Sequence, residues 1–141
     1  MTIRVVLADD SRAVRDVLAE ILNRSPEVDL VALADDEPTL LAAIEEFSPD
    51  VVVTDVRMPP TGTDEGVRVA ESLARTHPGI GVVILTQFND PGWLSRVFDR
   101  GTENRAWIMK EHVYSHGQLI AAVRTVHQGE RWIDPSLTAR S

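Results

Sequence analysis

Short apolar runs alternate along the chain with longer segments whose apolar residues recur at helical spacing. The runs are rich in β-branched residues, which is typical of strands that are buried on both faces of a parallel sheet. Five such strands are predicted, and they cover residues 3–8, 28–34, 51–54, 81–86 and 106–109.

The segments between these strands carry apolar residues every three or four positions, which predicts amphipathic helices. Turn-forming prolines and glycines separate helices from strands. Strict alternation of this kind predicts a doubly wound α/β fold, (βα)5, with a five-stranded parallel sheet whose simplest strand order is 2-1-3-4-5. The predicted helices cover residues 12–24, 38–47, 66–76, a segment that begins after Asp90-Pro91 and ends at Gly101, and 115–128.

Polar residues stand where four of the predicted strands end. Asp9 and Asp10 follow the first strand, Asp55 follows the third, Thr86 ends the fourth and Lys110 follows the fifth. The carboxyl ends of parallel strands meet at one edge of a sheet, and ligands bind there at the switch point, here between the first and third strands. We therefore expect three carboxylates, a hydroxyl and an ammonium group to share one site.

Such a cluster has a definite chemistry. Neighbouring carboxylates repel one another, and a hard cation with oxygen ligands, Mg²⁺ or Mn²⁺, offsets the repulsion. A carboxylate in this setting can attack a phosphoryl group and form an aspartyl phosphate. The cation, the Lys110 ammonium and the Thr86 hydroxyl can each meet one of the three phosphoryl oxygens.

Composition narrows the class of protein. A chain of 141 residues suits a single domain, and the absence of cysteine excludes disulfides and thiolate metal sites. The net charge of −8 argues against nucleic-acid binding by this segment itself. No apolar stretch has the length of a membrane span and no signal-peptide pattern is present, so we expect a cytoplasmic protein without a membrane partner.

The polar residues and their spacing resemble the receiver domain of two-component response regulators, a flavodoxin-like (CheY-like) fold. The steps are 45 residues from Asp10 to Asp55, 31 to Thr86 and 24 to Lys110. The resemblance implies that Asp55 accepts phosphate from a sensor histidine kinase. It also implies that Asp9, Asp10, Asp55 and the backbone carbonyl of Arg57 hold the metal, while Lys110 pairs with the phosphate.

The same resemblance implies a switch. Thr86 would move toward the phosphoryl group and Trp107, in the place of the family's aromatic residue, would turn inward with it. The surface formed by strand four, helix four, strand five and helix five would then control homodimer formation. A receiver of this kind is not an enzyme beyond self-phosphorylation and slow autodephosphorylation.

A finer resemblance is to receivers of the LuxR-type helix-turn-helix (NarL-like) subfamily. Its markers are the segments 55–61, 110–111 and 129–135. It implies that residues 1–130 form the receiver and that residues 131–141 begin a linker to a C-terminal DNA-binding domain, which this chain lacks. DNA contact and transcription regulation would then depend on that domain alone.

Some residues depart from the family pattern. Gln87 stands where a small residue is usual, and Trp107 is bulkier than the usual tyrosine or phenylalanine. Our hypothesis is that Arg57, Gln87 and Phe88 crowd the mouth of the site and tune hydrolysis of the phosphate. Gln87 also keeps open a degenerate receiver that acts as a phosphorylation-independent binding module.

Other interpretations remain open at this stage. A Mg²⁺-dependent phosphohydrolase with an aspartate nucleophile is disfavoured, because such enzymes often place an acid where Arg57 stands. Trp107 is either a switch residue or static packing. His112 and His116 could share a helix face as metal ligands, although a solvated pair is favoured because no third ligand is evident.

Overall fold

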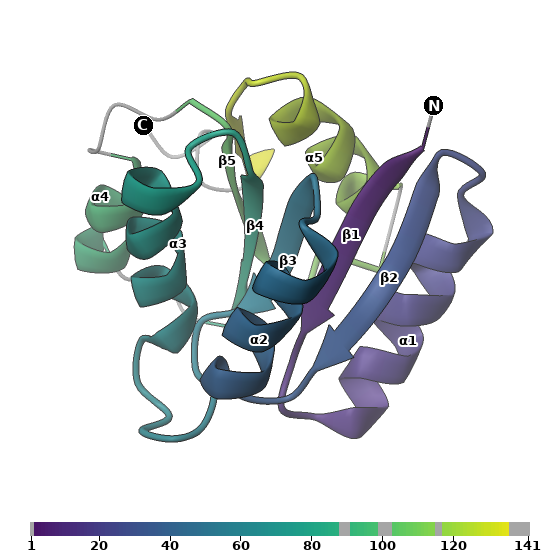
Figure 1. Cartoon of the computed structure of the whole chain (residues 1–141). Helices are drawn as coiled ribbons and strands as arrows, with labels where there is room; N and C mark the ends of the chain where they lie inside the picture. The colour runs from purple at the N-terminus through teal and green to yellow at the C-terminus, as the bar shows by residue number, and fades with distance from the viewer. Residues whose placement is uncertain (1, 88–90, 99–102, 115–116, 136–141) are drawn as a thin grey trace.

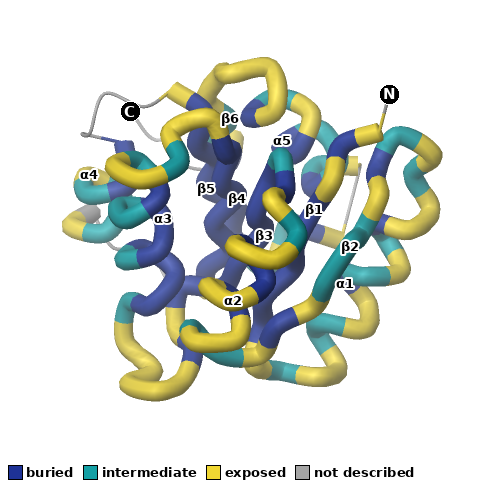
Figure 2. Tube along the Cα trace, in the orientation of Figure 1, coloured by how far each residue is buried: buried dark blue, intermediate teal, exposed yellow. Residues whose placement is uncertain are grey.

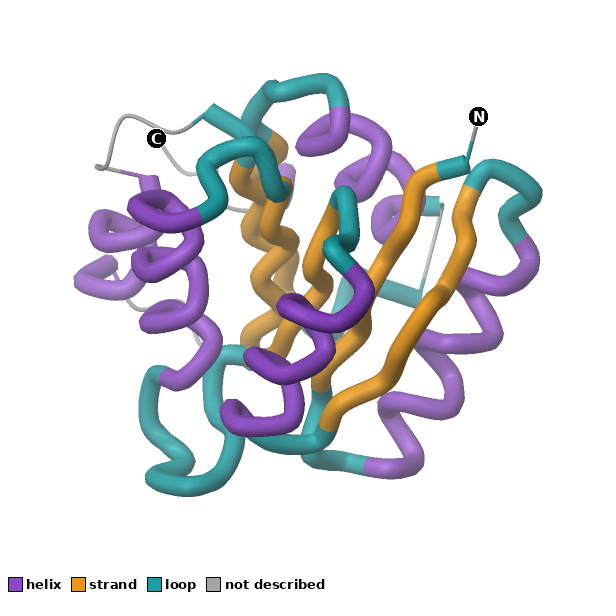
Figure 3. The backbone as a smooth tube through the Cα atoms, in the orientation of Figure 1, coloured by secondary structure: helices purple, strands orange, loops and turns teal. Residues whose placement is uncertain are grey.

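The computed structural model describes residues 2–87, 91–98, 103–114 and 117–135. Its strands are β1 (Ile3–Ala8), β2 (Val28–Ala34), β3 (Val51–Asp55), β4 (Gly81–Thr86), β5 (Arg105–Met109) and β6 (Trp132–Ile133). Its helices are α1 (Arg12–Arg24), α2 (Glu37–Phe47), α3 (Glu65–Thr76), α4 (Pro91–Phe98) and α5 (Gln118–His127). Strands and helices alternate as predicted (Figure 1, Figure 3).

The sheet is parallel and has the order β2-β1-β3-β4-β5-β6. The predicted order of the first five strands is confirmed, but the prediction of five strands was wrong. The sixth strand is Trp132–Ile133, which pairs with Ala106 and Trp107 at the β5 edge. Two residues are too few to produce a periodic pattern, and they fall in the segment 131–141 that was predicted as a linker.

Alternate residues of the strands point to opposite faces of the sheet, because side chains alternate along a β-strand. Val6, Val52 and Ile84 pack in the core that α2, α3 and α4 cover. Their neighbours Val53 and Leu85 pack in the core that α1 and α5 cover. The sheet is therefore buried between two helical layers, and the buried residues run along its centre (Figure 2).

Local signals explain the starts of the first two helices. Ser11 caps α1 by accepting a hydrogen bond from the Val14 amide, and Asp36 forms a capping box with Thr39 at the start of α2. The fifth helix begins at Gln118 rather than at residue 115, because residues 110–114 form a turn and Gly117 has a φ of +67°. Gly101, predicted to end the fourth helix, lies outside the described residues.

Within the described ranges, no helix combines the length and the apolar character that crossing a bilayer requires.

Candidate phosphoryl-accepting site

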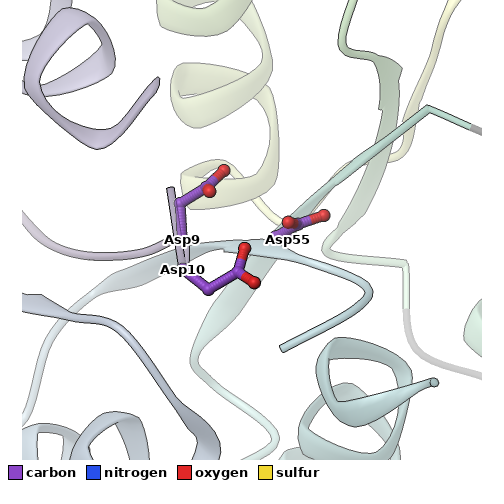
Figure 4. Close-up of side chains that lie close together, drawn as sticks. All are labelled: Asp9, Asp10 and Asp55. Carbon is purple, nitrogen blue, oxygen red and sulfur yellow. The ribbon is translucent and has the colours of Figure 1, made fainter. Parts of the chain in front are cut away.

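The carboxyl edge of the sheet brings the three predicted carboxylates together. Asp9 and Asp10 follow β1, and Asp55 ends the adjacent strand β3. One oxygen from each lies within 4.8 Å of the others (Figure 4). Asp9 is fully buried, Asp55 is 8% exposed and Asp10 is open to solvent. The cluster is therefore buried on the side of Asp9 and Asp55 and open to solvent at Asp10.

Lys110 supplies the cation that faces this cluster. Its Nζ lies 2.9 Å from Asp55 Oδ2 and 3.0 Å from Asp9 Oδ2. Its backbone amide donates a hydrogen bond of 2.7 Å to the carbonyl oxygen of Thr86, the last residue of β4. The structure thus brings together all five polar residues that the strand ends predicted: Asp9, Asp10, Asp55, Thr86 and Lys110.

One ammonium group does not balance three carboxylates. Burial raises the pKa of Asp55 to about 6; Lys110 opposes this rise, while Asp9 and Asp10 add to it. Burial also disfavours the charge of Lys110, but the two carboxylates in contact with it raise its pKa overall. Asp55 therefore needs more positive charge nearby to remain fully ionised at neutral pH.

The donor set fits a hard divalent cation. Asp9 Oδ2 is buried and faces the Lys110 ammonium at 3.0 Å as its one described polar partner, while Asp9 Oδ1 accepts a hydrogen bond from the Ser11 amide at 2.9 Å. All the available ligand atoms are oxygens, which Mg²⁺ prefers. Among the described residues, Asp9, Asp10 and Asp55 are the one group of three or more acidic or histidine residues that is close enough to share an ion.

A cavity of about 200 Å³ opens beside Asp55, and Asp10, Arg57, Thr86 and Gln87 are among its lining residues. The guanidinium carbon of Arg57 lies 5.4 Å from the centre of the Trp93 ring on α4, which is a cation–π distance. Arg57 and Gln87, two of the three residues predicted to crowd the mouth of the site, therefore line the cavity beside Asp55. The third, Phe88, lies outside the described residues.

The two predicted switch residues are buried in neighbouring strands. Thr86 is 1% exposed at the end of β4, and Trp107 is fully buried in β5, where it pairs in register with Ile84. Trp107 packs in the core beneath α2, α3 and α4. Its indole nitrogen is buried without a hydrogen bond. A rotation of this side chain would have to displace packed neighbours.

Gly66 allows α3 to begin directly against the end of β3, the strand that carries Asp55. Its amide donates a hydrogen bond of 2.9 Å to the carbonyl oxygen of Val56. A Cβ atom at this position would lie 2.1 Å from the carbonyl oxygen of Asp55, closer than any contact between non-bonded atoms allows. Only glycine therefore fits here without moving the backbone of Asp55.

The pattern of apolar runs did not reveal Glu65. This carboxylate is fully buried and accepts hydrogen bonds from the amides of Thr61, Gly62 and Thr63 and from the Thr61 hydroxyl. Burial alone would raise its pKa, but these hydrogen bonds outweigh burial and lower the pKa to about 2. Glu65 therefore organises the loop that leads from Asp55 to α3, a loop that contains a cis Pro59–Pro60 bond.

Arg105 is also buried and was not predicted. Its guanidinium donates hydrogen bonds to the carbonyl oxygens of Ile80, Ala70 and Asn104 and to the side chain of Asn104. Burial lowers its pKa to about 10. Through the bond to Ala70, Arg105 joins β5 to α3. Arg105 begins β5 whereas Asp55 ends β3, so these contacts lie at the opposite end of the parallel strands from the carboxylate cluster.

Of the two histidines considered as metal ligands, the structure describes only His112, and among the described residues it belongs to no group that could share a metal ion. His112 Nδ1 lies 2.9 Å from Asp134 Oδ2, and that contact raises its pKa. His116 lies outside the described residues. Asp134 is 1% exposed and follows β6, so it is a buried acid that the sequence patterns did not reveal.

Comparison with known proteins identifies relatives of this chain. The oxygen regulatory protein NreC of Staphylococcus epidermidis is 35% identical over 135 residues, which cover 96% of this chain and 59% of NreC. NreC of Staphylococcus aureus is 33% identical with the same coverage. The chain therefore spans about 59% of the length of these curated relatives.

Solved structures show the same fold. The receiver domain of the putative response regulator NarL from Mycobacterium tuberculosis is 26% identical, with a TM-score of 0.78 over 92% of this chain and 98% of that one. A LuxR-family two-component response regulator from an Aurantimonas species is 23% identical, with a TM-score of 0.84 over 99% and 94%. The family model for the response regulator receiver domain matches residues 5–124. By sequence and by fold, this chain belongs to the response regulator receiver domain family.

Proposed function

We propose that this chain is a phosphoaccepting receiver in which Asp55 takes a phosphoryl group from a phosphohistidine of a sensor histidine kinase. The observation that carries the proposal is the cluster itself. Three carboxylates lie within 4.8 Å of one another, and the Lys110 ammonium lies 2.9 Å from Asp55. An accessible nucleophile, a shared cation and an oxygen-rich metal pocket are the parts that phosphoryl transfer to an aspartate needs.

Each residue has a chemical role in this proposal. An Asp55 oxygen forms a bond to phosphorus as the phosphorus–nitrogen bond of the donor breaks. Asp9, Asp10, Asp55 and the backbone carbonyl of Arg57 would hold Mg²⁺ or Mn²⁺, which when bound supplies positive charge for the phosphoryl oxygens. Lys110 and the Thr86 hydroxyl meet the remaining phosphoryl oxygens.

The output is conformational rather than catalytic. Phosphate on Asp55 biases an equilibrium between inactive and active states through Thr86 and Trp107. The surface of β4, α4, β5 and α5 then controls homodimer formation and a DNA-binding domain, to which the chain would lead after β6, since β6 itself belongs to the receiver sheet. The relatives support a DNA-linked output: RcsB dimers have been solved bound to DNA. Such a regulator acts in the cytoplasm.

The test is phosphorylation of the chain with a small donor. The chain is incubated with acetyl phosphate, with and without Mg²⁺, and the modified residue is located by mass spectrometry. We expect one Mg²⁺-dependent phosphoryl group on Asp55, absent from Asp55→Asn. Asp50→Asn is the matched control, because Asp50 accepts a hydrogen bond from the Arg4 amide at the opposite edge of the sheet.

Two other outcomes contradict the proposal. An absence of any Mg²⁺-dependent modification, or of any response to beryllofluoride, would favour a binding module that works without phosphate. Rapid multiple turnover of small phosphate esters would favour a phosphohydrolase, against which Arg57 already argues.

A further inference from the structure

The segment after β6 is hydrogen-bonded to the strand that carries the site's cation. Strand β6 pairs with Ala106 and Trp107 of β5. The backbone amide of Asp134 then donates a hydrogen bond of 2.8 Å to the carbonyl oxygen of Trp107. The side chain of Asp134 turns back and accepts a hydrogen bond of 2.9 Å from the amide of Met109. The residue directly before Lys110 is therefore held by Asp134.

Asp134 also holds the other side of the same turn. His112 Nδ1 lies 2.9 Å from Asp134 Oδ2 and 3.1 Å from Oδ1. The His112 amide donates to the carbonyl oxygen of Met109 at 2.9 Å, which closes the turn around Lys110. One carboxylate thus contacts the residues on both sides of Lys110.

The position of the Lys110 backbone is set from two directions. Its amide is bonded to the Thr86 carbonyl oxygen on the β4 side, and Asp134 holds its neighbours on the β6 side. The Lys110 side chain then reaches two carboxylates at 2.9 and 3.0 Å. Contacts this short to two partners leave little tolerance for movement of the turn, because catalytic geometry is sensitive to displacements of about 1 Å.

The burial of Asp134 is costly unless its contacts are made. A carboxylate that is 1% exposed loses nearly all of its hydration, and hydrogen bonds to charged groups must replace it. The amide of Met109 and the imidazole of His112 provide such bonds. A hydrophobic residue of similar size at position 134 could fill the space but would leave the turn unanchored, because it could not accept the bonds from Met109 and His112.

We infer that Asp134 is a positioning residue for phosphoryl transfer: it anchors the Met109–His112 turn and so places Lys110 against Asp55, and it joins the phosphorylation site directly to the segment that follows β6. The inference rests on the proposed function of Asp55. Coupling of this kind is reciprocal. A phosphoryl group on Asp55 that forms a new contact with Lys110 therefore also changes the environment of Asp134.

The first experiment uses the unmodified chain. ¹⁵N-labelled protein with Mg²⁺ is titrated with beryllofluoride, and the amide signals of Met109 and Asp134 are followed. We expect both signals to shift together with that of Asp55. The Asp50 and Arg4 amides, at the opposite edge of the sheet, serve as the internal control and stay in place.

The second experiment separates charge, hydrogen bonding and folding. Asp134→Ala removes every side-chain contact, whereas Asp134→Asn keeps an oxygen that can accept from Met109. We expect Asp134→Ala to slow phosphorylation by acetyl phosphate and to weaken beryllofluoride binding by roughly tenfold or more. Asp134→Asn should restore most of the loss, and Asp50→Ala, the matched control, should behave as wild type. Thermal melts show that each variant is folded.

The outcomes distinguish the two proposals. If beryllofluoride does not bind to the wild-type chain, the proposed function fails and the role of Asp134 fails with it. If it binds, but the Asp134 amide does not shift or a folded Asp134→Ala variant matches Asp50→Ala, only the role of Asp134 is overturned. Asp134→Asn as impaired as Asp134→Ala would also overturn anchoring through the Met109 hydrogen bond.

Discussion

Glu65 offers a sharp test of how the loop after Asp55 is held. The perturbation is Glu65→Gln, which keeps the size of the side chain and removes its charge. The Glu65 carboxylate accepts three backbone amides and the Thr61 hydroxyl, so an amide group in its place must turn its own N–H donors toward other donors. The substitution should therefore destabilise the fold at neutral pH.

The size of the effect follows from the pKa. A fall from the ordinary value of 4.5 to about 2 in the folded state corresponds to roughly 3 kcal/mol of folding free energy at neutral pH. Because the folded pKa is the lower one, this stabilisation is fully present above pH 4.5 and is lost as the pH falls toward about 2. By linkage, the wild-type protein should already have lost roughly 1 kcal/mol of this folding free energy near pH 3.5. The Glu65→Gln variant lacks the carboxylate and therefore shows no such loss.

The assay is urea unfolding of both proteins between pH 7 and pH 3.5, with the Trp fluorescence as the signal. The difference in unfolding free energy should be about 3 kcal/mol at pH 7 and should shrink below pH 4.5. Glu45→Gln is the control, since this glutamate side chain is 74% exposed and should change stability by less than about 0.5 kcal/mol. A difference that does not depend on pH would refute the reasoning.

Three further predictions concern single residues. Lys110→Met should raise the pKa of Asp55 above about 6, as ¹³C NMR of the carboxyl group in the absence of Mg²⁺ can measure; an unchanged pKa would contradict the role of Lys110. Truncating Gln87 and Arg57 to alanine should shorten the lifetime of the phosphate on Asp55 by admitting water, and an unchanged half-life would end the crowding hypothesis. Arg105→Lys should cost about 1–3 kcal/mol in urea unfolding, because one ammonium group cannot reach the carbonyl oxygens that the guanidinium fork reaches; an unaltered midpoint would show that these bonds contribute little.

The main charged residues of the site could be predicted because each buried strand is a run of apolar residues, and the first polar residue after the run shows where the strand ends. Asp9, Asp55 and Lys110 each follow a run of buried residues, and parallel topology places such ends at one edge. No knowledge of side-chain packing was needed for this step. The order of the first five strands followed from the same alternation.

Glu65, Arg105 and Asp134 could not be predicted in this way. Their partners are mainly backbone amides and carbonyl groups of loops and neighbouring elements, and no residue pattern encodes those contacts. Asp134 bonds to Met109, 25 residues earlier, and Arg105 bonds to Ala70, 35 residues earlier. Strand β6 was missed for a related reason, since a two-residue strand has no period to detect.

Gly66 has a consequence for how mutational scans of this protein should be interpreted. Every substitution there forces an atom into the backbone of Asp55, so a saturation library should lose function at position 66 about as completely as at position 55. The two positions fail for unrelated reasons, one steric and one chemical. Intolerance to substitution therefore cannot by itself distinguish the residue that reacts from the residue that makes room for it.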